Sequence, residues 1–164
     1  MSAVSDVVID APTVDDIPAI AELIAEDLQD LRLPIVAERQ WETARRLVQE
    51  QSASLYVRVA RLVETPADGE GAHPAAAGLL VAHRRVSVKF CGDAYWIETL
   101  LVGDSLRRRG IGRRLVAGLM DHATVTGAGG IDLEAYRMNA PASYLYRALG
   151  FRRLGRERYS ISLH

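Results

Sequence analysis

Five arginines and two glycines fall within eight residues, Arg107 to Arg114, in the second half of the chain. They follow an apolar stretch and lead into a helical pattern, and the full segment reads Val102-Gly-Asp-Ser-Leu-Arg-Arg-Arg-Gly-Ile-Gly-Arg-Arg-Leu115. The free N–H groups and the dipole at the start of a helix attract anions. Glycines let the main chain approach a phosphate, and arginines add bidentate contacts to it. The segment therefore indicates binding of a phosphate-bearing ligand.

On these residues alone three interpretations stay open: a phosphate-bearing cofactor, a nucleic acid, or a solvated basic surface. A Walker loop is excluded because no Gly-Lys-Ser/Thr follows, and the spacing also differs from the Gly-x-Gly-x-x-Gly of dinucleotide sites. The single cysteine, Cys91, has no histidine close to it in the sequence, which argues against a catalytic thiol. Four histidines share no spacing typical of metal ligands, so we expect no metal. They are His73, His83, His122 and His164.

The chain has 164 residues, of which 49% are hydrophobic and 25% charged, the balance of an ordinary globular protein. We expect one domain, residues 1–164. The longest apolar run, Ala75 to Ala82, is far shorter than the ~18 residues that suggest a membrane span. Asp6 and Asp10 near the N-terminus argue against a secretory signal. We therefore expect a cytoplasmic protein with no membrane partner.

The formal net charge of −1 conceals a segregation of charge. Residues 1–50 carry 11 acidic and 4 basic side chains, whereas residues 101–164 carry 5 acidic and 11 basic ones. Such a division predicts one region that faces an anion and another that tolerates a cation. A compositional gradient without function would give the same division.

Alternating and helical patterns predict a mixed α/β fold in the order β-α-α-β-β-β-α-β-α-β-β. Strands are expected at residues 7–9, 54–63, 76–88, 94–102, 131–136, 151–154 and 158–163. Helices are expected from Thr13, paired with Asp16 as a cap, to about 31, and at 37–50, 110–127 and 139–149. Residues 65–74 are expected to form a polar loop and residues 91–93 a turn. The Arg-Gly segment thus lies where a strand gives way to a helix.

Two segments carry a family resemblance. Arg107-x-x-Gly110-x-Gly112 after a strand resembles Gln/Arg-x-x-Gly-x-Gly/Ala, the acetyl-CoA pyrophosphate loop of the GNAT superfamily of N-acetyltransferases. The segment Asn139-Ala-Pro-Ala-Ser-Tyr-Leu-Tyr-Arg-Ala-Leu-Gly-Phe151 resembles the superfamily's Asn-x-x-Ala-x-x-Leu-Tyr-x-x-x-Gly-Phe, with every position in register. The predicted element order also matches that fold from the first strand to the last. The resemblance implies an acetyl-CoA-dependent N-acetyltransferase that works by direct transfer in a ternary complex.

The resemblance also implies where the co-substrate acetyl-CoA binds. Main-chain groups of Leu100 and Val102 would bind the pantetheine arm, and Asn139 would lie beside the pantetheine or the thioester. The loop residues would hold the pyrophosphate. They are Arg107, Arg108, Arg109, Gly110, Ile111, Gly112 and Arg113.

Two side chains match the positions of catalytic groups in the family. Glu98, four residues before Val102, is where many members carry a general base, and its alternatives are an acceptor contact or a structural carboxylate. Tyr146 matches the tyrosine that faces the sulfur of CoA and could protonate the leaving thiolate, or could only pack against the cofactor.

The expected partners are acetyl-CoA and an unidentified amine acceptor, without nucleic acid, and family members often form homodimers. Nine acidic residues between Thr13 and Glu50 favour a cationic acceptor. Two rival functions stay open: a catalytically silent CoA-binding regulatory module and an arginine-rich nucleic-acid binder. The alternatives differ in whether acetyl-CoA releases free thiol in the presence of amines.

Overall fold

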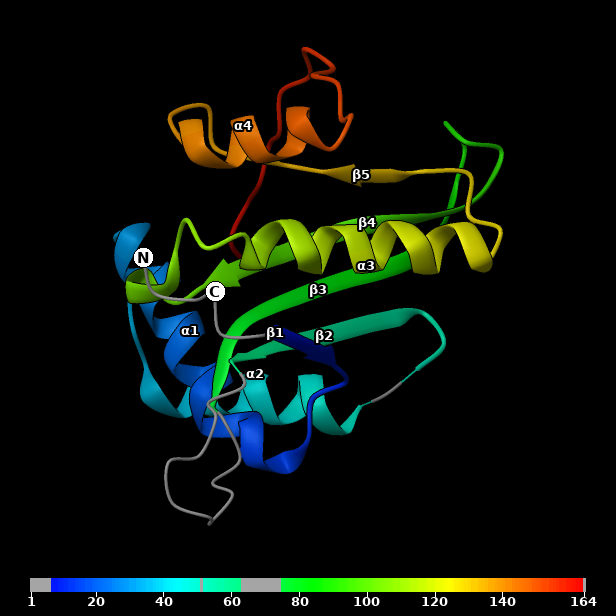
Figure 1. Cartoon of the computed structure of the whole chain (residues 1–164). Coiled ribbons are helices and arrows are strands. Elements are labelled where there is room, and N and C mark those ends of the chain that lie inside the picture. The colour runs from blue at the N-terminus through cyan, green and yellow to red at the C-terminus, as the bar shows by residue number, and fades with distance from the viewer. Residues whose placement is uncertain (1–6, 51, 63–74, 164) are drawn as a thin grey trace. The chain divides into compact units, whose positions relative to one another are not determined.

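The computed structural model describes residues 7–50, 52–62 and 75–163, so the loop predicted at 65–74 lies outside the described residues. The chain divides into two compact units, Met1–Glu134 and Ala135–His164. Each unit is described by itself. The larger one contains the sheet and three of the helices (Figure 1).

The larger unit is built on a five-stranded sheet in the order β1-β2-β3-β4-β5. Its strands are β1 (Val7–Asp10), β2 (Leu55–Leu62), β3 (Ala76–Ser87), β4 (Gly92–Val102) and β5 (Ile131–Leu133). The first four pair antiparallel, and β5 pairs parallel with β4. The mixed sheet confirms the predicted fold class, although the fifth strand ends three residues before the expected boundary at 136.

Helices cover both faces of this sheet (Figure 1). On one face, α1 (Ile17–Asp30) and α2 (Ala37–Gln49) pack on β2 and β3. The apolar residues at this interface recur at helical and at strand spacing, as amphipathic elements require. They are Ile17, Ile20, Leu23, Ala44, Val48, Val57, Val59, Leu79 and Val81. On the other face lies α3 (Ile111–Val125), which buries Ile111, Leu115, Val116, Leu119 and Ala123.

A buried ion pair fixes the start of α1. The Thr13 N–H donates to the Asp16 carboxylate at 2.7 Å, which confirms the predicted cap, and a short 3-10 helix at Val14–Asp16 precedes α1. The same carboxylate accepts from Nε and Nη2 of Arg61 on β2, at 3.2 and 2.5 Å. Both side chains are almost fully buried. The pair joins the end of β2 to the beginning of the first helix.

The smaller unit contains α4 (Ala140–Ala148), which confirms the predicted fourth helix. The Asn139 side chain caps it by accepting from the Ala142 N–H at 3.1 Å, and Gly150 follows in the left-handed region with φ 90°. A left-handed glycine just past the last turn is a common helix terminator.

The two terminal strands expected at 151–154 and 158–163 are a correction, because residues 151–163 form neither helix nor strand. Their alternating pattern is present, but a strand is defined by the ladder it shares with a neighbour, and no such ladder forms here. Tyr159, Ile161 and Leu163 are more than 80% exposed, so the apolar side of the pattern gains no burial. Alternation alone therefore predicted strands that this structure does not contain.

Candidate active site

A β-bulge lies at Glu98, the predicted base. On β4, Ile97 is opposite Ala82 and Thr99 is opposite Val81, so Glu98 is an extra residue between two paired ones. Bulges bend a strand and re-aim a side chain, and they are frequent beside active sites. The Glu98 side chain is exposed, as contact with solvent or with an acceptor requires.

The pairing of β4 with β5 ends just before this bulge. Their parallel pairing runs from Tyr95 with Ile131 to Ile97 with Leu133 and ends there. The Gly103 N–H donates to the Ala77 oxygen on the β3 side, and the main-chain groups of successive strand residues point to alternate sides. Leu100 and Val102 therefore direct their main-chain groups away from β3, toward the gap in the sheet.

The beginning of β5 is held tightly against β4, which confines the separation to the other end. The Phe90 ring lies across Gly130 so closely that a Cβ at that glycine would overlap it. The Gly129 N–H donates to the Asp93 oxygen at 2.8 Å, and Lys89 forms an ion pair with Asp132 of β5 at 2.5 Å. These contacts bring β5 alongside β4 for three residues and no further.

The segment between β4 and α3 presents a row of free amide groups. A short 3-10 helix at Asp104–Leu106 leads into Arg108 and Gly110, both left-handed with φ 67° and 80°. Within the part of the chain that the structure describes, no acceptor takes a hydrogen bond from the main-chain N–H groups of residues 108–113. Six consecutive free donors at the N-terminus of a helix form a site suited to a phosphate.

Gly78 on β3, which the sequence analysis did not single out, brings α3 close to the sheet. A Cβ at this position would lie 3.0 Å from the Leu101 oxygen and 3.1 Å from Cγ2 of Ile111. Because no side chain intervenes, the first turn of α3 rests directly on the strands that carry the loop. The only signal for this role in the sequence is a glycine inside a predicted strand.

The loop arginines divide into two groups. Arg107 is engaged: its guanidinium forms ion pairs with Asp104 at 2.5 Å and with Asp30 of α1 at 3.1 Å. No ion pair among the described residues engages the other four, which are exposed. They are Arg108, Arg109, Arg113 and Arg114. The free arginines are thus the ones that follow Arg107 and flank the unpaired amides.

In the smaller unit, Tyr146 is buried on α4, with 9% of its surface exposed. Its ring packs edge-to-face against Phe151, with 5.8 Å between centroids. Burial raises the pKa of the phenol to about 12, so the proton stays on the oxygen throughout the physiological range. Asn139, also predicted to touch the co-substrate, is exposed and caps the same helix.

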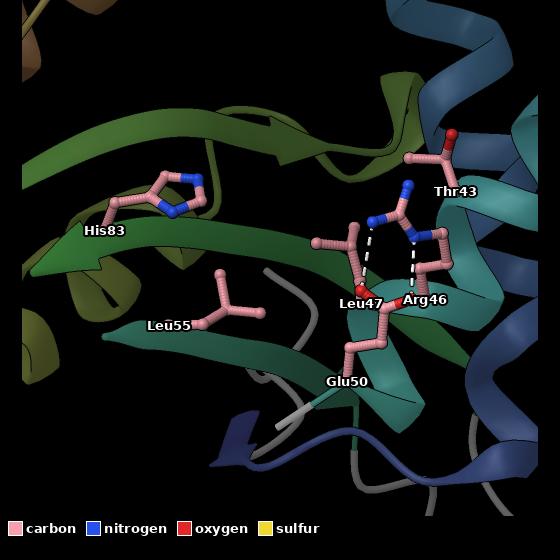
Figure 2. Close-up of a pocket in the computed structure, with 6 residues that line it drawn as sticks. All are labelled: Thr43, Arg46, Leu47, Glu50, Leu55 and His83. Carbon is pink, nitrogen blue, oxygen red and sulfur yellow. Dashed lines mark hydrogen bonds and ion pairs between the residues drawn. The ribbon is translucent and has the colours of Figure 1, made fainter. Parts of the chain in front are cut away.

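A pocket of about 250 Å³ opens on the face of the sheet that α1 and α2 cover (Figure 2). Leu47 of α2 and Leu55 of β2 form an apolar side, and the bidentate Arg46–Glu50 pair lies at the edge. His83 closes the other side, and its cross-strand partner is Trp96, two residues before the bulge. The pocket is therefore lined by α2, β2 and β3, and its nearest link to β4 is the pairing of His83 with Trp96; none of its lining residues belongs to the segment at 103–114.

The other titratable groups of the described residues do not gather into a second cluster. His122 of α3 packs between Tyr56 and Tyr95, and burial and then Arg58 and Arg84 lower its pKa. Cys91 is exposed in the turn at residues 88–91, slightly before its expected place. Across the described ranges no three His, Cys, Asp or Glu side chains gather as metal ligands would. No helix in those ranges is long and apolar enough to cross a membrane.

Three curated proteins are among those similar to part of this chain. Streptothricin acetyltransferase of Streptomyces lavendulae is 38% identical over 74 residues, 45% of this chain and 39% of the relative. N-alpha-acetyltransferase RimI of Mycobacterium tuberculosis is 42% identical over 66 residues, 40% of each chain. Protein ML0378 of Mycobacterium leprae is 46% identical over 66 residues, 40% of this chain and 18% of its own length. The match thus spans less than half of each of these relatives.

A solved structure extends the fold comparison to nearly the whole chain. The aminoglycoside acetyltransferase AAC(6')-Iy, in complex with a CoA bisubstrate analog, superposes with a TM-score of 0.72 at 19% identity. The superposition covers 96% of this chain and 99% of that one. At the level of sequence, the model of the acetyltransferase (GNAT) family matches residues 20–151, which include the bulge, the loop and α4. The chain belongs to the GNAT family of acetyltransferases.

Proposed function

We propose that this acetyltransferase moves an acetyl group from acetyl-CoA to a primary amine by direct attack in a ternary complex, and that residues 1–164 act as one catalytic domain. The observation that carries the proposal is the row of free amides at 108–113, placed where β4 and β5 separate. An adenine-nucleotide thioester needs both features: donors for its pyrophosphate and an extended gap for its pantetheine arm. The motif from Arg107 to Gly112 supports the same assignment.

The donor site consists of the loop and the open edge of β4. The amides of residues 108–113 would hold the pyrophosphate, and the free arginines beside them would neutralise its charge. The main-chain groups of Leu100 and the N–H of Val102, which point away from β3, would form hydrogen bonds with the amide groups of the pantetheine arm, while the Val102 oxygen accepts from Arg107. Asn139 is the proposed contact from the smaller unit. When bound, acetyl-CoA supplies an acetyl group activated as a thioester.

Two side chains carry the proton transfers. Glu98 accepts a proton, through water, from the acceptor ammonium, because only the neutral amine can attack a carbonyl carbon. The amine nitrogen then forms a bond to that carbon, and the bond from carbon to sulfur breaks. Tyr146 donates its phenol proton to the leaving thiolate, and the second proton, released by the nitrogen as it becomes an amide, returns through water to the Tyr146 oxygen. Burial keeps the phenol of Tyr146 protonated at the start of every turnover but also makes it a weaker acid, so the support for this role is its place in the Asn139–Phe151 motif and not its pKa.

The acceptor is a primary amine that enters from the α2 side of the sheet. The pocket lined by Leu47, Leu55 and His83 supports this direction, because it opens beside the strand that carries Glu98 and away from the phosphate loop. The names of two relatives indicate an antibiotic amine and a protein α-amine as acceptors. Both are amines, so the chemistry proposed for Glu98 applies to either.

The substitution Gly110→Asp tests the donor site. A Cβ added at Gly110 would have no atom within 4 Å, but the φ of 80° strains any L side chain there, so an aspartate adds backbone strain as well as a negative charge against the pyrophosphate. We expect CoA binding, measured by calorimetry, to be lost. Gly127→Asp is the matched control, because Gly127 is also left-handed, also has open space around it and lies at the far end of α3. Unchanged CoA affinity in a folded Gly110→Asp protein would overturn the assignment.

Turnover is tested separately by following thiol release from acetyl-CoA with a panel of amines and identifying the product by mass. Transfer to at least one amine is the expected result. A protein that binds CoA but releases no thiol with any amine would instead be the silent regulatory module.

A further inference from the structure

Two contacts tie the last turns of α1 to the phosphate loop. The Asp30 carboxylate accepts from Nη2 of Arg107 at 3.1 Å. One helical turn earlier, the Glu26 carboxylate accepts from the Asp104 N–H at 3.3 Å. Asp27 lies beside them, and its pKa is raised by burial and then by Asp30, as expected where a helix end packs against other atoms. The helix and the loop are far apart in sequence but share one polar junction.

Arg107 is the centre of this junction. Besides Asp30, its guanidinium contacts the Asp104 carboxylate at 2.5 Å, and its Nε donates to the Val102 oxygen at 3.2 Å. One side chain thus connects the end of β4, the turn that follows it and α1. Its donors are directed at acceptors of the protein itself, whereas no ion pair among the described residues engages the other four arginines of the loop.

From this geometry we infer that Arg107 is a positioning residue, which joins α1 to the phosphate loop and holds the amides of residues 108–113 in place, and does not itself bind the pyrophosphate. The inference rests on the proposed function, because it concerns the same loop. It assigns the first residue of the motif a role different from that of the arginines after it. The phosphate charge would be met by Arg108, Arg109, Arg113 and Arg114.

Neutralising Asp30 should change CoA affinity in opposite directions, depending on whether Arg107 binds the pyrophosphate or positions the loop. Asp30 is a negative charge beside a site for an anion, so its neutralisation should strengthen CoA binding if Arg107 is a ligand that Asp30 merely competes for. If Asp30 and Arg107 together hold the loop, the same change should weaken binding in spite of the more favourable charge. The sign of the effect of Asp30→Asn therefore separates the two.

The test is a double-mutant cycle on CoA affinity with Asp30→Asn, Arg107→Gln and the double variant, measured by calorimetry. We expect each single variant to weaken CoA binding about 3- to 30-fold, and the double variant to be no weaker than the worse single one, as for two residues that act as a unit. Tighter or unchanged binding by Asp30→Asn, or additive losses in the double variant, would overturn the inference.

Two matched controls isolate position from charge. Glu22→Gln removes the same charge from α1 at a residue without a contact to the loop among the described hydrogen bonds and ion pairs, and should leave affinity unchanged. Arg109→Gln removes a loop charge without disturbing the junction, so it should weaken binding and reduce its dependence on salt. Arg107→Gln should leave that salt dependence nearly unchanged, and a reduction equal to that of Arg109→Gln would contradict the inference.

A second measurement does not need the ligand. In the free protein, trypsin should cleave after Arg108 and Arg109 faster in Asp30→Asn than in wild type or Glu22→Gln, because the loop is less restrained. Equal cleavage rates in all three proteins would count against a positioning role. Absence of CoA binding by the wild-type protein would refute the proposed function instead, so the two failures can be told apart.

Discussion

Glu98 and Tyr146, the two residues assigned to proton transfer, have contrasting surroundings. Glu98 is exposed on a bulge, where water can reach its carboxylate. Tyr146 is buried, and desolvation holds its pKa near 12. Exposure suits a base that exchanges protons with solvent between turnovers, whereas burial keeps the phenol protonated but makes it a weaker acid, so its proposed role depends on its position and not on its pKa.

Replacement of Tyr146 by phenylalanine tests the acid role. The ring keeps its packing against Phe151 and loses only the hydroxyl, so acetyl-CoA affinity should hardly change. We expect kcat to fall about 10- to 1000-fold, the usual contribution of a general acid. Steady-state kinetics over a range of pH gives the comparison. Wild-type kcat in Tyr146→Phe at every pH would show that another group protonates the thiolate.

The same residue affects stability at alkaline pH. Its folded-state pKa of about 12 lies above the ordinary value of 10, so the folded state holds the proton more tightly than the unfolded one. The resulting stabilisation is complete below pH 10 and is lost as the pH rises toward 12, a loss on the order of 3 kcal/mol. Urea unfolding measures the free energy of unfolding of wild type and Tyr146→Phe from pH 10 to 12. The decline should be absent from Tyr146→Phe, and an equally steep decline in both proteins would contradict the raised pKa of Tyr146.

The sequence predicted which residues belong to the candidate site better than it predicted their conformations and contacts. The motif predicted a segment of free amides at a helix start, which the structure contains at residues 108–113, because glycines and a helix N-terminus leave such donors unpaired in any fold. Neither the left-handed Arg108 nor the partners of Arg107 could be predicted, since both depend on where α1 ends in space. The bulge at Glu98 could not be predicted either, because an extra residue in a strand is defined only by its register with the neighbouring strand.

At the scale of elements, the sequence predicted the helices and the first five strands well because each buries one periodic face. The two terminal strands failed for the complementary reason: residues 151–163 carry alternation but enter no ladder. The buried Asp16–Arg61 pair was also invisible in the sequence, although the Asp16 cap was predicted. It joins two elements that are 45 residues apart, a separation that local patterns do not encode.

The Asp16→Asn substitution tests how much this junction contributes. Arg61 would be left as a buried cation without its full charge partner, so we expect the free energy of unfolding to fall by about 3–5 kcal/mol. Asp15→Asn, at the exposed neighbouring position, is the control and should change it little. Urea unfolding of the two variants decides the matter, and equal stabilities would mean that the pair contributes nothing.

For the molecule as a whole, the segregated charge has two effects in the larger unit: acidic side chains form local ion pairs, and the loop after Arg107 keeps a positive charge. Part of the acidic half is neutralised locally, since Glu42 pairs with Arg45, Glu50 with Arg46, and Asp30 with Arg107. Among the described residues, no ion pair neutralises Arg108, Arg109, Arg113 or Arg114 in this way. A field that attracts polyanions to the loop is therefore better supported than one that attracts cations to α2.

The separation of donor and acceptor regions along β4 is testable with Thr43→Trp. Thr43 lines the pocket, and a tryptophan there should fill it and raise the KM for the acceptor amine about 10-fold or more. CoA affinity should be unchanged, because the loop lies beyond the other end of the strand. Arg39→Trp, one turn earlier on α2 and outside the pocket, is the control. A KM shift of the same size in both variants would place the acceptor elsewhere.

The bulge at Glu98 has an evolutionary consequence. Because Ile97 and Thr99 already face consecutive residues of β3, removal of this single codon would restore a regular ladder and leave every other side chain of β4 on its present face. The carboxylate is thus an insertion that the sheet accommodates without rearrangement. A one-residue deletion is accordingly a short genetic path from an acetyltransferase to a folded thioester-binding protein without its proposed base, and the reverse insertion is an equally short path back.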